Sequence, residues 1–203
     1  MRSLYNYIIF TKDRYDNKKD IKGKELILNT EITERDYHFV NRIGRVVSTP
    51  INLKTPIQSG DDVILHHNVF RRWFDVRGNE RNSGSFISDT TFTVYHDQIF
   101  AYKRNKKWQA LPEFCFVAPI EQDSKWSVLA EKELVGELVY SNEYLNSLGV
   151  AEGDVVGFTP ASEYEFNIEG KKLYRIKSND INIKYGQTQK NNRSRWRGAN
   201  WAR

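Results

Sequence analysis

Two short stretches decide the fold of this chain: GRVV at residues 44–47, and GDDVI at residues 60–64, which begins sixteen residues later. The same pattern returns as GELV at residues 136–139 and GDVV at residues 153–156, with a spacing of seventeen residues. A Gly-strand unit, a spacer and a Gly-Asp-strand unit therefore occur twice. Such self-similarity at an offset of about ninety residues is typical of a tandem repeat and predicts two related structural units.

The two copies also open and close alike. Apolar opening strands are expected at residues 5–10 and 114–119, ahead of each Gly-strand unit. Residues 92–99 align without a gap on residues 174–181, and both segments end in a polar turn and an isoleucine. Apolar and polar residues alternate in these segments, between Gly, Asp and Pro punctuation, which indicates short, half-buried antiparallel strands. An aromatic content of 13% also favours strands over helices.

The pattern predicts an all-β protein made of two tandem small β-barrels followed by a basic C-terminal tail. The first barrel is expected over residues 1–104, the second over residues 105–184 and the tail over residues 185–203. In the first unit, turn-forming residues within an insertion at residues 70–89 predict an extended hairpin. In the second unit, one helical turn is expected at residues 143–148, ended by Gly149.

The net charge of +5 is concentrated at the C-terminal end. Six of the 31 basic residues and none of the 26 acidic ones lie from Lys184 onward, so the rest of the chain carries 25 basic against 26 acidic residues. The predicted barrels are therefore nearly neutral, and the basic character belongs to the tail.

The single cysteine, Cys115, lies in an apolar run where a thiol packs as a small hydrophobe. An internal disulfide is impossible, and a reducing compartment is expected. The apolar stretch near the N-terminus is shorter than a signal-peptide core. No segment reaches the roughly 20 apolar residues of a membrane span. We therefore expect a cytoplasmic protein without membrane attachment.

The second copy carries four recognisable motifs: GELV at 136–139, GVAEGDVVGF at 149–158, LYRI at 173–176 and the closing Asp180-Ile181. In these motifs it resembles the GroES-type co-chaperonin family. Gly153 permits the positive φ of a tight turn, and Asp154 can accept hydrogen bonds from nearby backbone amides. The resemblance spans roughly residues 5–183 and implies GroES-like barrels. Tandem modules of this family occur in plastids and single modules in large bacteriophages, and the Asn and Lys content here is closer to the phage proteins.

In that family a flexible loop after the first strand presents an aliphatic tripeptide to an apolar groove of the chaperonin. The matching segment here lies between Phe10 and Gly44 and contains Leu26, Ile27 and Leu28, so the resemblance implies a chaperonin-binding hook. The alternative is an ordinary half-buried strand, which also accommodates three successive aliphatic residues. The second copy has a shorter connection with Trp126, Val128 and Leu129, a weaker candidate for a second loop.

No catalytic constellation or metal site is predicted. The only thiol is expected to be buried, and the chain has neither a G-x-S-x-G elbow nor a phosphate loop. His66 and His67 are adjacent and would point to opposite faces of a strand, so they could not share one ion. No Cys and His cluster exists to complete such a site. We therefore expect no enzyme activity, no metal and no cofactor.

The tail has three open interpretations. Its aromatic and basic side chains are Arg193, Arg195, Trp196, Arg197 and Trp201. They suit phosphate contacts with base stacking on a nucleic acid, and they equally suit anchoring on a neighbouring subunit or protein partner. The composition is also that of a solvated, disordered end.

The resemblance implies a co-chaperonin-like cap, in which a homo-oligomeric ring binds a GroEL-like, ATP-driven chaperonin and assists protein folding. The alternative is a non-catalytic structural or adaptor protein, for example a phage virion component, that uses GroES-like barrels for assembly. The first interpretation places the protein in the cytoplasm, that of the host if a phage encodes it. The second places it in a virion, attached to other structural proteins.

Overall fold

The computed structural model describes residues 3–15, 18–22, 24–27, 40–121 and 131–187. Strands dominate these residues, and the helical structure among them consists of one short α-helix and three lone 3-10 turns, which confirms the all-β class. Within the same residues, none of the helices has the length and apolar character needed to cross a bilayer.

The first half of the chain forms a seven-stranded antiparallel sheet in the order β11-β10-β5-β4-β1-β9-β8. Its strands are β1 (Tyr7–Phe10), β4 (Ile43–Ser48), β5 (Asp62–Leu65), β8 (Phe86–Ser88), β9 (Thr91–Val94), β10 (Ile99–Arg104) and β11 (Lys107–Ala110). Two 3-10 turns, η2 (His67–Val69) and η3 (His96–Gln98), follow β5 and β9. Two hairpins project from this sheet: β2 (Lys18–Ile21) with β3 (Lys24–Ile27), and β6 (Arg72–Phe74) with β7 (Glu80–Asn82). The second of them confirms the hairpin expected in the insertion.

The second half forms a six-stranded antiparallel sheet in the order β15-β16-β12-β13-β14-β17. Its strands are β12 (Phe114–Glu121), β13 (Glu131–Tyr140), β14 (Asp154–Phe158), β15 (Tyr164–Ile168), β16 (Lys171–Lys177) and β17 (Ile181–Gln187). The helix α1 (Glu143–Ser147) lies between β13 and β14, and the 3-10 turn η4 (Ser178–Asp180) joins β16 to β17. Gly149 follows α1 with φ +77°, so the single helical turn and its left-handed end are confirmed.

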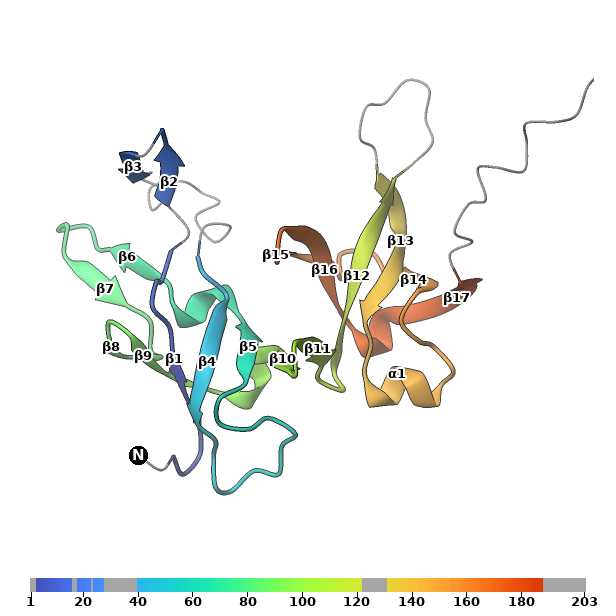
Figure 1. The fold of residues 1–203 in the computed structure, drawn as a ribbon, viewed down its shortest axis with the longest axis horizontal. Helices are drawn as coiled ribbons and strands as arrows, with labels where there is room; N and C mark the ends of the chain where they lie inside the picture. Colours follow the sequence, from blue (N-terminus) through green and yellow to red (C-terminus); the bar gives the residue numbers. More distant parts are fainter. Residues whose placement is uncertain (1–2, 16–17, 23, 28–39, 122–130, 188–203) are drawn as a thin grey trace, which may run out of the picture.

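The two sheets have the same strand order once β11 is set aside (Figure 1). The order β10-β5-β4-β1-β9-β8 corresponds position by position to β17-β14-β13-β12-β16-β15. In each half the opening strand lies at the centre, paired on one side with the strand of the Gly-strand unit and on the other with the closing strand. The repeat in the sequence is therefore a repeat in topology.

Neither sheet closes into a barrel. Among the residues that the structure describes, no ladder joins the two edge strands of either sheet. The expected unit boundaries also shift in detail. Strand β11 lies after residue 104 but pairs with β10 of the first sheet, and β17 continues to Gln187, so the expected start of the tail at residue 185 falls within a strand. The division into two domains stays a prediction.

Glycine is required at the same position of both sheets because the neighbouring strand approaches closely. A Cβ atom at Gly44 would clash with the side chain of Ile9 on β1. A Cβ atom at Gly136 would lie 2.8 Å from the backbone oxygen of Ala118 and 3.0 Å from the Cβ of Val117 on β12. The two glycines of the repeated Gly-strand units therefore allow the opening strand to pack in each half.

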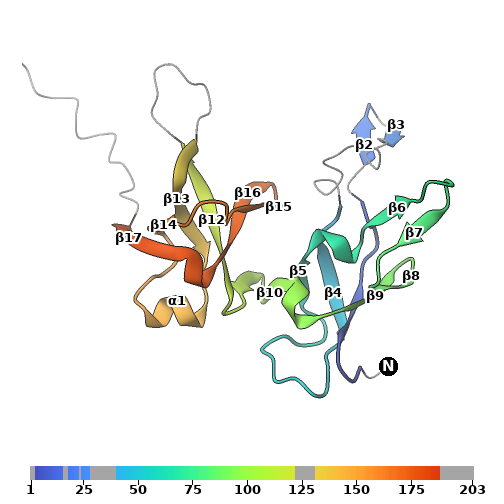
Figure 2. The same ribbon diagram turned by 180° about the vertical axis from the view of Figure 1, so that it is seen from behind.

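A shared hydrophobic core joins the two halves. Besides the core within each sheet, one buried cluster combines Ile64, Phe100, Ala101, Trp108 and Ala110 with Phe116, Phe166, Ile168 and Leu173. Aromatic edges meet across it, with ring centroids 5.8 Å apart for Phe100 and Phe166 and 4.8 Å for Phe100 and Phe114. The halves lie side by side around this cluster (Figures 1 and 2), and the connection between them is itself buried at Leu111.

Candidate functional site

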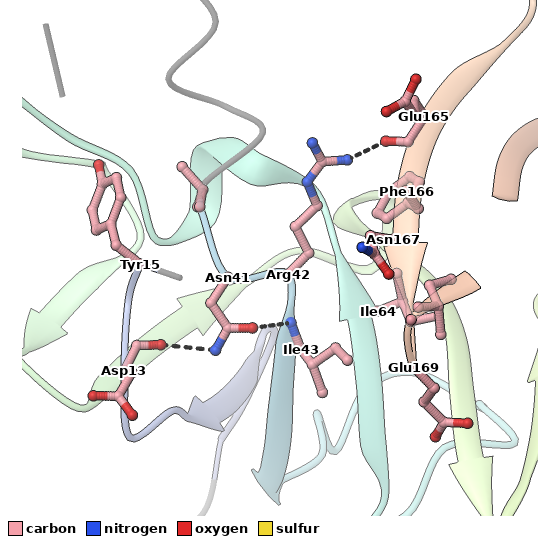
Figure 3. A pocket seen from close by; sticks show the side chains of 13 residues that line it. Asp13, Tyr15, Asn41, Arg42, Ile43, Ile64, Glu165, Phe166, Asn167 and Glu169 are labelled. Carbon is pink, nitrogen blue, oxygen red and sulfur yellow. Dashed lines mark hydrogen bonds between the residues drawn. The ribbon is translucent and has the colours of Figure 1, made fainter. Parts of the chain in front are cut away.

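The segment that carries the predicted hook is held at its base. Tyr15 and Val40 form an antiparallel β-bridge, and the backbone N–H of Asn41 donates to the carbonyl of Arg14 over 2.9 Å. The Asn41 amide donates to the carbonyl of Asp13 (2.7 Å) and accepts from the N–H of Ile43 (3.0 Å) (Figure 3). The two ends of the hook segment are therefore clamped side by side on the first sheet.

Arginine and tyrosine side chains bind this base to the start of the β6–β7 hairpin. The Arg14 Nε donates to the carbonyl of Phe70 over 3.0 Å, and its guanidinium lies over the rings of Phe86 and Phe92. Burial lowers the pKa of Arg14. The Tyr15 hydroxyl accepts from the N–H of Arg72 over 2.9 Å. The base of the hook segment is thus held by the side chains of Arg14 and Tyr15 at its N-terminal end and by the side chain of Asn41 at its C-terminal end.

The predicted hook lies partly in a hairpin strand instead of a loop. Leu26 and Ile27 belong to β3, which pairs with β2 along its whole length, and Lys22 turns the hairpin with φ +54°. Leu28 lies outside the described residues. Leu26 is 46% exposed, so its side chain remains available to a partner.

Ile21 is the functional candidate that sequence reasoning missed. It pairs with Lys24, and Leu26 lies two residues further along β3, so Ile21 and Leu26 share one face of the hairpin. Ile21 is 47% exposed. The two side chains form what we call the hairpin patch, residues Ile21 and Leu26. The signal that could have found Ile21 is its position two residues before Gly23, where a tight hairpin turn would pair it with Lys24 and so place it on the same face as Leu26.

Further exposed apolar side chains lie on the β6–β7 hairpin, at the same end of the first sheet as β2 and β3 (Figures 1 and 2). Phe74 is 54% exposed and Val76, in its turn, is fully exposed. An apolar side chain held in water on a projecting hairpin is available for contact with a partner. This end of the first half therefore carries apolar groups on both hairpins.

A cleft of about 700 Å³ lies beside the clamp, between the two halves (Figure 3). Asp13, Tyr15, Asn41 and Arg42 line it from the first half, and Glu165, Phe166, Asn167 and Glu169 from the second. Its charged groups largely serve internal contacts. The Glu169 carboxylate accepts from Lys103 Nζ and from the Trp108 indole, and Lys103 is the main cause of its lowered pKa.

Arg42 links the hook segment to the second half. Its Nη1 donates to the backbone carbonyl of Glu165 over 2.6 Å, and its guanidinium carbon lies 4.5 Å from the ring centroid of Phe166 and 5.0 Å from that of Tyr164. Arg42 is only 9% exposed. A cation held by a carbonyl and two aromatic rings favours one relative position of the halves. We infer that the cleft is mainly a junction.

The expectation that His66 and His67 point to opposite faces of a strand is wrong. They lie at the start of η2, where the chain leaves the strand, and their rings stack with centroids 4.4 Å apart. Tyr164 of the second half contacts His67 through its hydroxyl. Burial is the main cause of a lowered pKa in both rings: it lowers the pKa of His67 to about 3 and also lowers the pKa of His66. Both rings are therefore neutral near pH 7. They join the junction, and no three His, Cys, Asp or Glu of the described residues are grouped to hold a metal.

The remaining predicted residues are placed as follows. Cys115 is fully buried, and burial raises the pKa of its thiol to about 12, so it is a neutral group at physiological pH. Trp126, Val128 and Leu129 of the second predicted loop lie outside the described residues, as do Arg193, Arg195, Trp196, Arg197 and Trp201 of the tail.

No protein-family model matches this chain, and a search of curated proteins finds no match either. The geometry described above is therefore the basis for any statement about function.

Proposed function

We propose that this protein is a co-chaperonin-like cap, a non-catalytic homo-oligomer that binds a GroEL-like, ATP-dependent chaperonin and assists protein folding. The hairpin patch carries this proposal: two exposed aliphatic side chains on a projecting hairpin whose base is clamped to a duplicated β-fold. In this proposal each half is an open version of a GroES-like barrel, the first with β11 as its edge strand and the second with β17.

The place of the hook in the topology supports the proposal. The hook segment connects β1 to β4, and the second predicted loop with Trp126, Val128 and Leu129 connects β12 to β13. These connections are equivalent in the repeated strand order. Each chain would thus offer up to two hooks, one from each half.

The free energy that one hook can contribute is too small for stable binding to the chaperonin, so several hooks must bind at once. Full burial of one Ile or Leu side chain stabilises a complex by about 1.5–3 kcal/mol, and the hairpin patch is already half-buried. Association also costs translational and rotational freedom. A single hairpin therefore binds weakly, and a ring of hooks that engages a ring of grooves gains affinity through effective concentration. The ATP hydrolysis belongs to the chaperonin.

The rival proposal is a structural or adaptor protein, for example a virion component, because the buried core between the halves suits a rigid assembly unit. Size-exclusion chromatography and negative-stain imaging of the pure protein, with and without a GroEL-like chaperonin and ADP or ATP, separate the two. A nucleotide-dependent complex with the chaperonin supports the cap. Rings or arrays that form but do not bind the chaperonin would refute the proposed co-chaperonin-like cap and would favour the structural or adaptor protein.

A further inference from the structure

A second pocket, of about 630 Å³, lies within the first half, apart from the cleft at the junction. It is bounded by the turn η2, the strand β6, the connection at residues 83–85 and the turn η3. The described residues that line it all belong to the first half and lie outside the hook segment. Its volume falls in the range of about 300–1,000 Å³ that is typical of small-molecule sites. The pocket is therefore a candidate binding site that is independent of the proposed chaperonin contact.

Two aromatic side chains from different elements line this pocket. Trp73 of β6 is 45% exposed, and Tyr95, at the start of η3, is 59% exposed. Rings in the core pack against each other, as Phe70 and Phe92 do with centroids 4.8 Å apart. Within the described residues, neither Trp73 nor Tyr95 has such a ring contact or lies under a cation. Their faces are thus available to a ligand that packs on aromatic rings.

A buried hydroxyl in the lining indicates a partner that enters the pocket. Ser85 lines the pocket although it is only 6% exposed. Its backbone carbonyl accepts from the N–H of Thr93 over 2.7 Å, but its hydroxyl makes no hydrogen bond within the part of the chain that the structure describes. Because the great majority of buried polar side chains have a hydrogen-bond partner, this hydroxyl suits a polar group of a ligand.

Two side-chain amides and a second hydroxyl add neutral polar groups. Gln98 Oε1 accepts from the backbone N–H of Tyr95 over 3.1 Å, so its NH₂ group is the part that can donate to a ligand. The exposed amide of Asn68 makes no hydrogen bond with another described residue. Ser83 Oγ donates to the carbonyl of Val69 over 2.6 Å and retains its capacity to accept. The lining therefore offers both donors and acceptors.

This combination suits a neutral sugar. Arg71 also lines the pocket, but it already has an interaction partner within the protein, so it is given no role in binding. Sugar hydroxyls donate and accept hydrogen bonds, as the amides and hydroxyls of the lining do. A pyranose ring with equatorial hydroxyls presents only C–H groups on its two faces, and such an apolar face packs on an aromatic ring.

We propose that this pocket binds a pyranose unit of a neutral, β-linked saccharide chain of the cellulose or chitin type. One face of the sugar packs on Trp73, with Tyr95 as the second ring. Ser85, Asn68 and Gln98 bind the sugar hydroxyls. Both rings are about half-exposed, so the saccharide chain can continue beyond the bound unit. A nucleic-acid strand would also stack on the rings, but the amides and hydroxyls supply no charge to neutralise its phosphates.

Fluorine NMR of the full chain labelled with fluorotryptophan tests the proposal. The chain has five tryptophans, and substituting one of them at a time assigns each resonance. Titration with cellohexaose and with chitohexaose, each up to about 10 mM, should shift the Trp73 resonance along a saturating curve for at least one of the two. The resonance of Trp108, which is 4% exposed in the shared core, should not move.

Three variants measure the roles of the lining. Ser85→Ala should weaken binding about two- to tenfold with little change in Tm, because its hydroxyl would bind the ligand and makes no hydrogen bond to a described residue. Tyr95→Ala should weaken binding at least about fivefold, the size expected for an aromatic anchor. The matched control is Phe74→Ala, because Phe74 is a 54% exposed neighbour of Trp73 on the opposite face of the same strand. Its dissociation constant should stay within about twofold of the parent value.

Three results would overturn the proposal. The first is a Trp73 resonance that neither saccharide moves, and a labelled oligo(dT) that moves it instead would assign the pocket to nucleic acid. The second is a set of shifts confined to Trp126, Trp196 or Trp201, which would place the sugar elsewhere on the chain. The third is unchanged saccharide affinity in both Ser85→Ala and Tyr95→Ala. Circular dichroism melting of each variant verifies that the fold is retained, and none of these results depends on chaperonin binding.

Discussion

Asp61 and Asp154 occupy the same place in the two copies of the Gly-Asp turn. Each carboxylate accepts a hydrogen bond over 2.8 Å from the backbone N–H three residues earlier, that of Gln58 and that of Ala151. Each also pairs with a cation from one of the two equivalent strands β10 and β17, Asp61 with Arg104 at 2.6 Å and Asp154 with Lys184 at 2.8 Å. The repeat therefore preserves a turn together with the ionic contact that closes it.

Asp154→Asn should destabilise the second half. The Asp154 side chain is 2% exposed, and the change removes charged hydrogen bonds to a buried group, which costs about 1–3 kcal/mol. Chemical denaturation at pH 7 measures this difference. A variant as stable as the parent protein would show that the turn folds without its carboxylate.

The same pair predicts a pH dependence. The backbone hydrogen bond from Ala151, and then Lys184, lower the pKa of Asp154. A carboxylate with a lowered pKa stabilises the fold fully above its ordinary pKa of about 3.9 and loses this effect as the pH falls through the folded value. The gap in stability between the parent and Asp154→Asn should therefore be constant near neutral pH and should close in acid. A gap that widens in acid would contradict this assignment.

Gly136→Ala should cost about 1–3 kcal/mol, because the new methyl group meets the backbone of β12, which cannot move aside as a side chain can. Gly84→Ala is the matched control, since nothing lies within 4 Å of a Cβ there and its φ is not positive. Thermal melting should show a lower Tm for Gly136→Ala alone. Equal melting of both variants would mean that β12 and β13 can separate freely.

Arg42→Met should loosen the junction between the halves. The change retains the aliphatic length of a side chain that is 9% exposed but leaves the Glu165 carbonyl without its charged donor, which costs about 1–3 kcal/mol. Arg45→Met is the control. Arg45 pairs with Asp62 on an exposed surface, where an ion pair contributes little stability, so this variant should have the same Tm as the parent. An unchanged Tm of Arg42→Met would show that Arg42 does not stabilise the junction between the halves.

Leu26→Glu and Ile21→Glu should each abolish chaperonin binding while the Tm stays close to that of the parent, because both side chains are about half-exposed. Ile27→Glu, at the centre of the predicted hook, is expected to do the same. Ile51→Glu is the control, since Ile51 is a 64% exposed aliphatic residue of the same half. Retained chaperonin binding, or a large fall in Tm, would instead indicate that the β2–β3 hairpin is a structural element and not a chaperonin-binding hook. Pull-down on immobilised chaperonin and thermal melting give the two readouts.

Removal of residues 188–203 should leave both sheets folded, because β17 ends at Gln187 and all repeated motifs lie before it. Assembly or partner attachment should suffer instead. If the tail anchors protein, light scattering will report a lower oligomer mass. If it binds nucleic acid, the truncated chain will lose a salt-sensitive affinity. A chain unchanged in both assays would leave the tail without either role.

The sequence predicted those features that each half determines locally. The Gly-Asp turns, the single helical turn ended by Gly149 and the burial of Cys115 follow from residue types over a few positions, and all of them are confirmed. The relation between the copies was visible because both turns use the same chemistry. Barrel closure was not predicted correctly, since it depends on which edge strands meet over long distances and not on local alternation.

The candidate site was less predictable than the fold. Leu26 and Ile27 were found, but their hairpin depends on a pairing with β2, which has few apolar residues and therefore no clear strand pattern. His66 and His67 were misjudged because the strand ends one residue before them, and a 3-10 turn places both rings on one side. The shared core was missed entirely, because alternation identifies a buried face but not the face that covers it.

The shared core explains why the two copies have so few residues in common. Phe100 and Asn182 follow equivalent isoleucines at the start of β10 and β17, yet Phe100 is buried against the other half while Asn182 faces water. The two equivalent positions therefore meet opposite physical requirements, an aromatic residue in one copy and a polar residue in the other. Positions that serve a copy's own folding, such as the turn glycines and aspartates, meet the same requirement in both copies. Differences between the copies are thus the expected result of packing one half against the other.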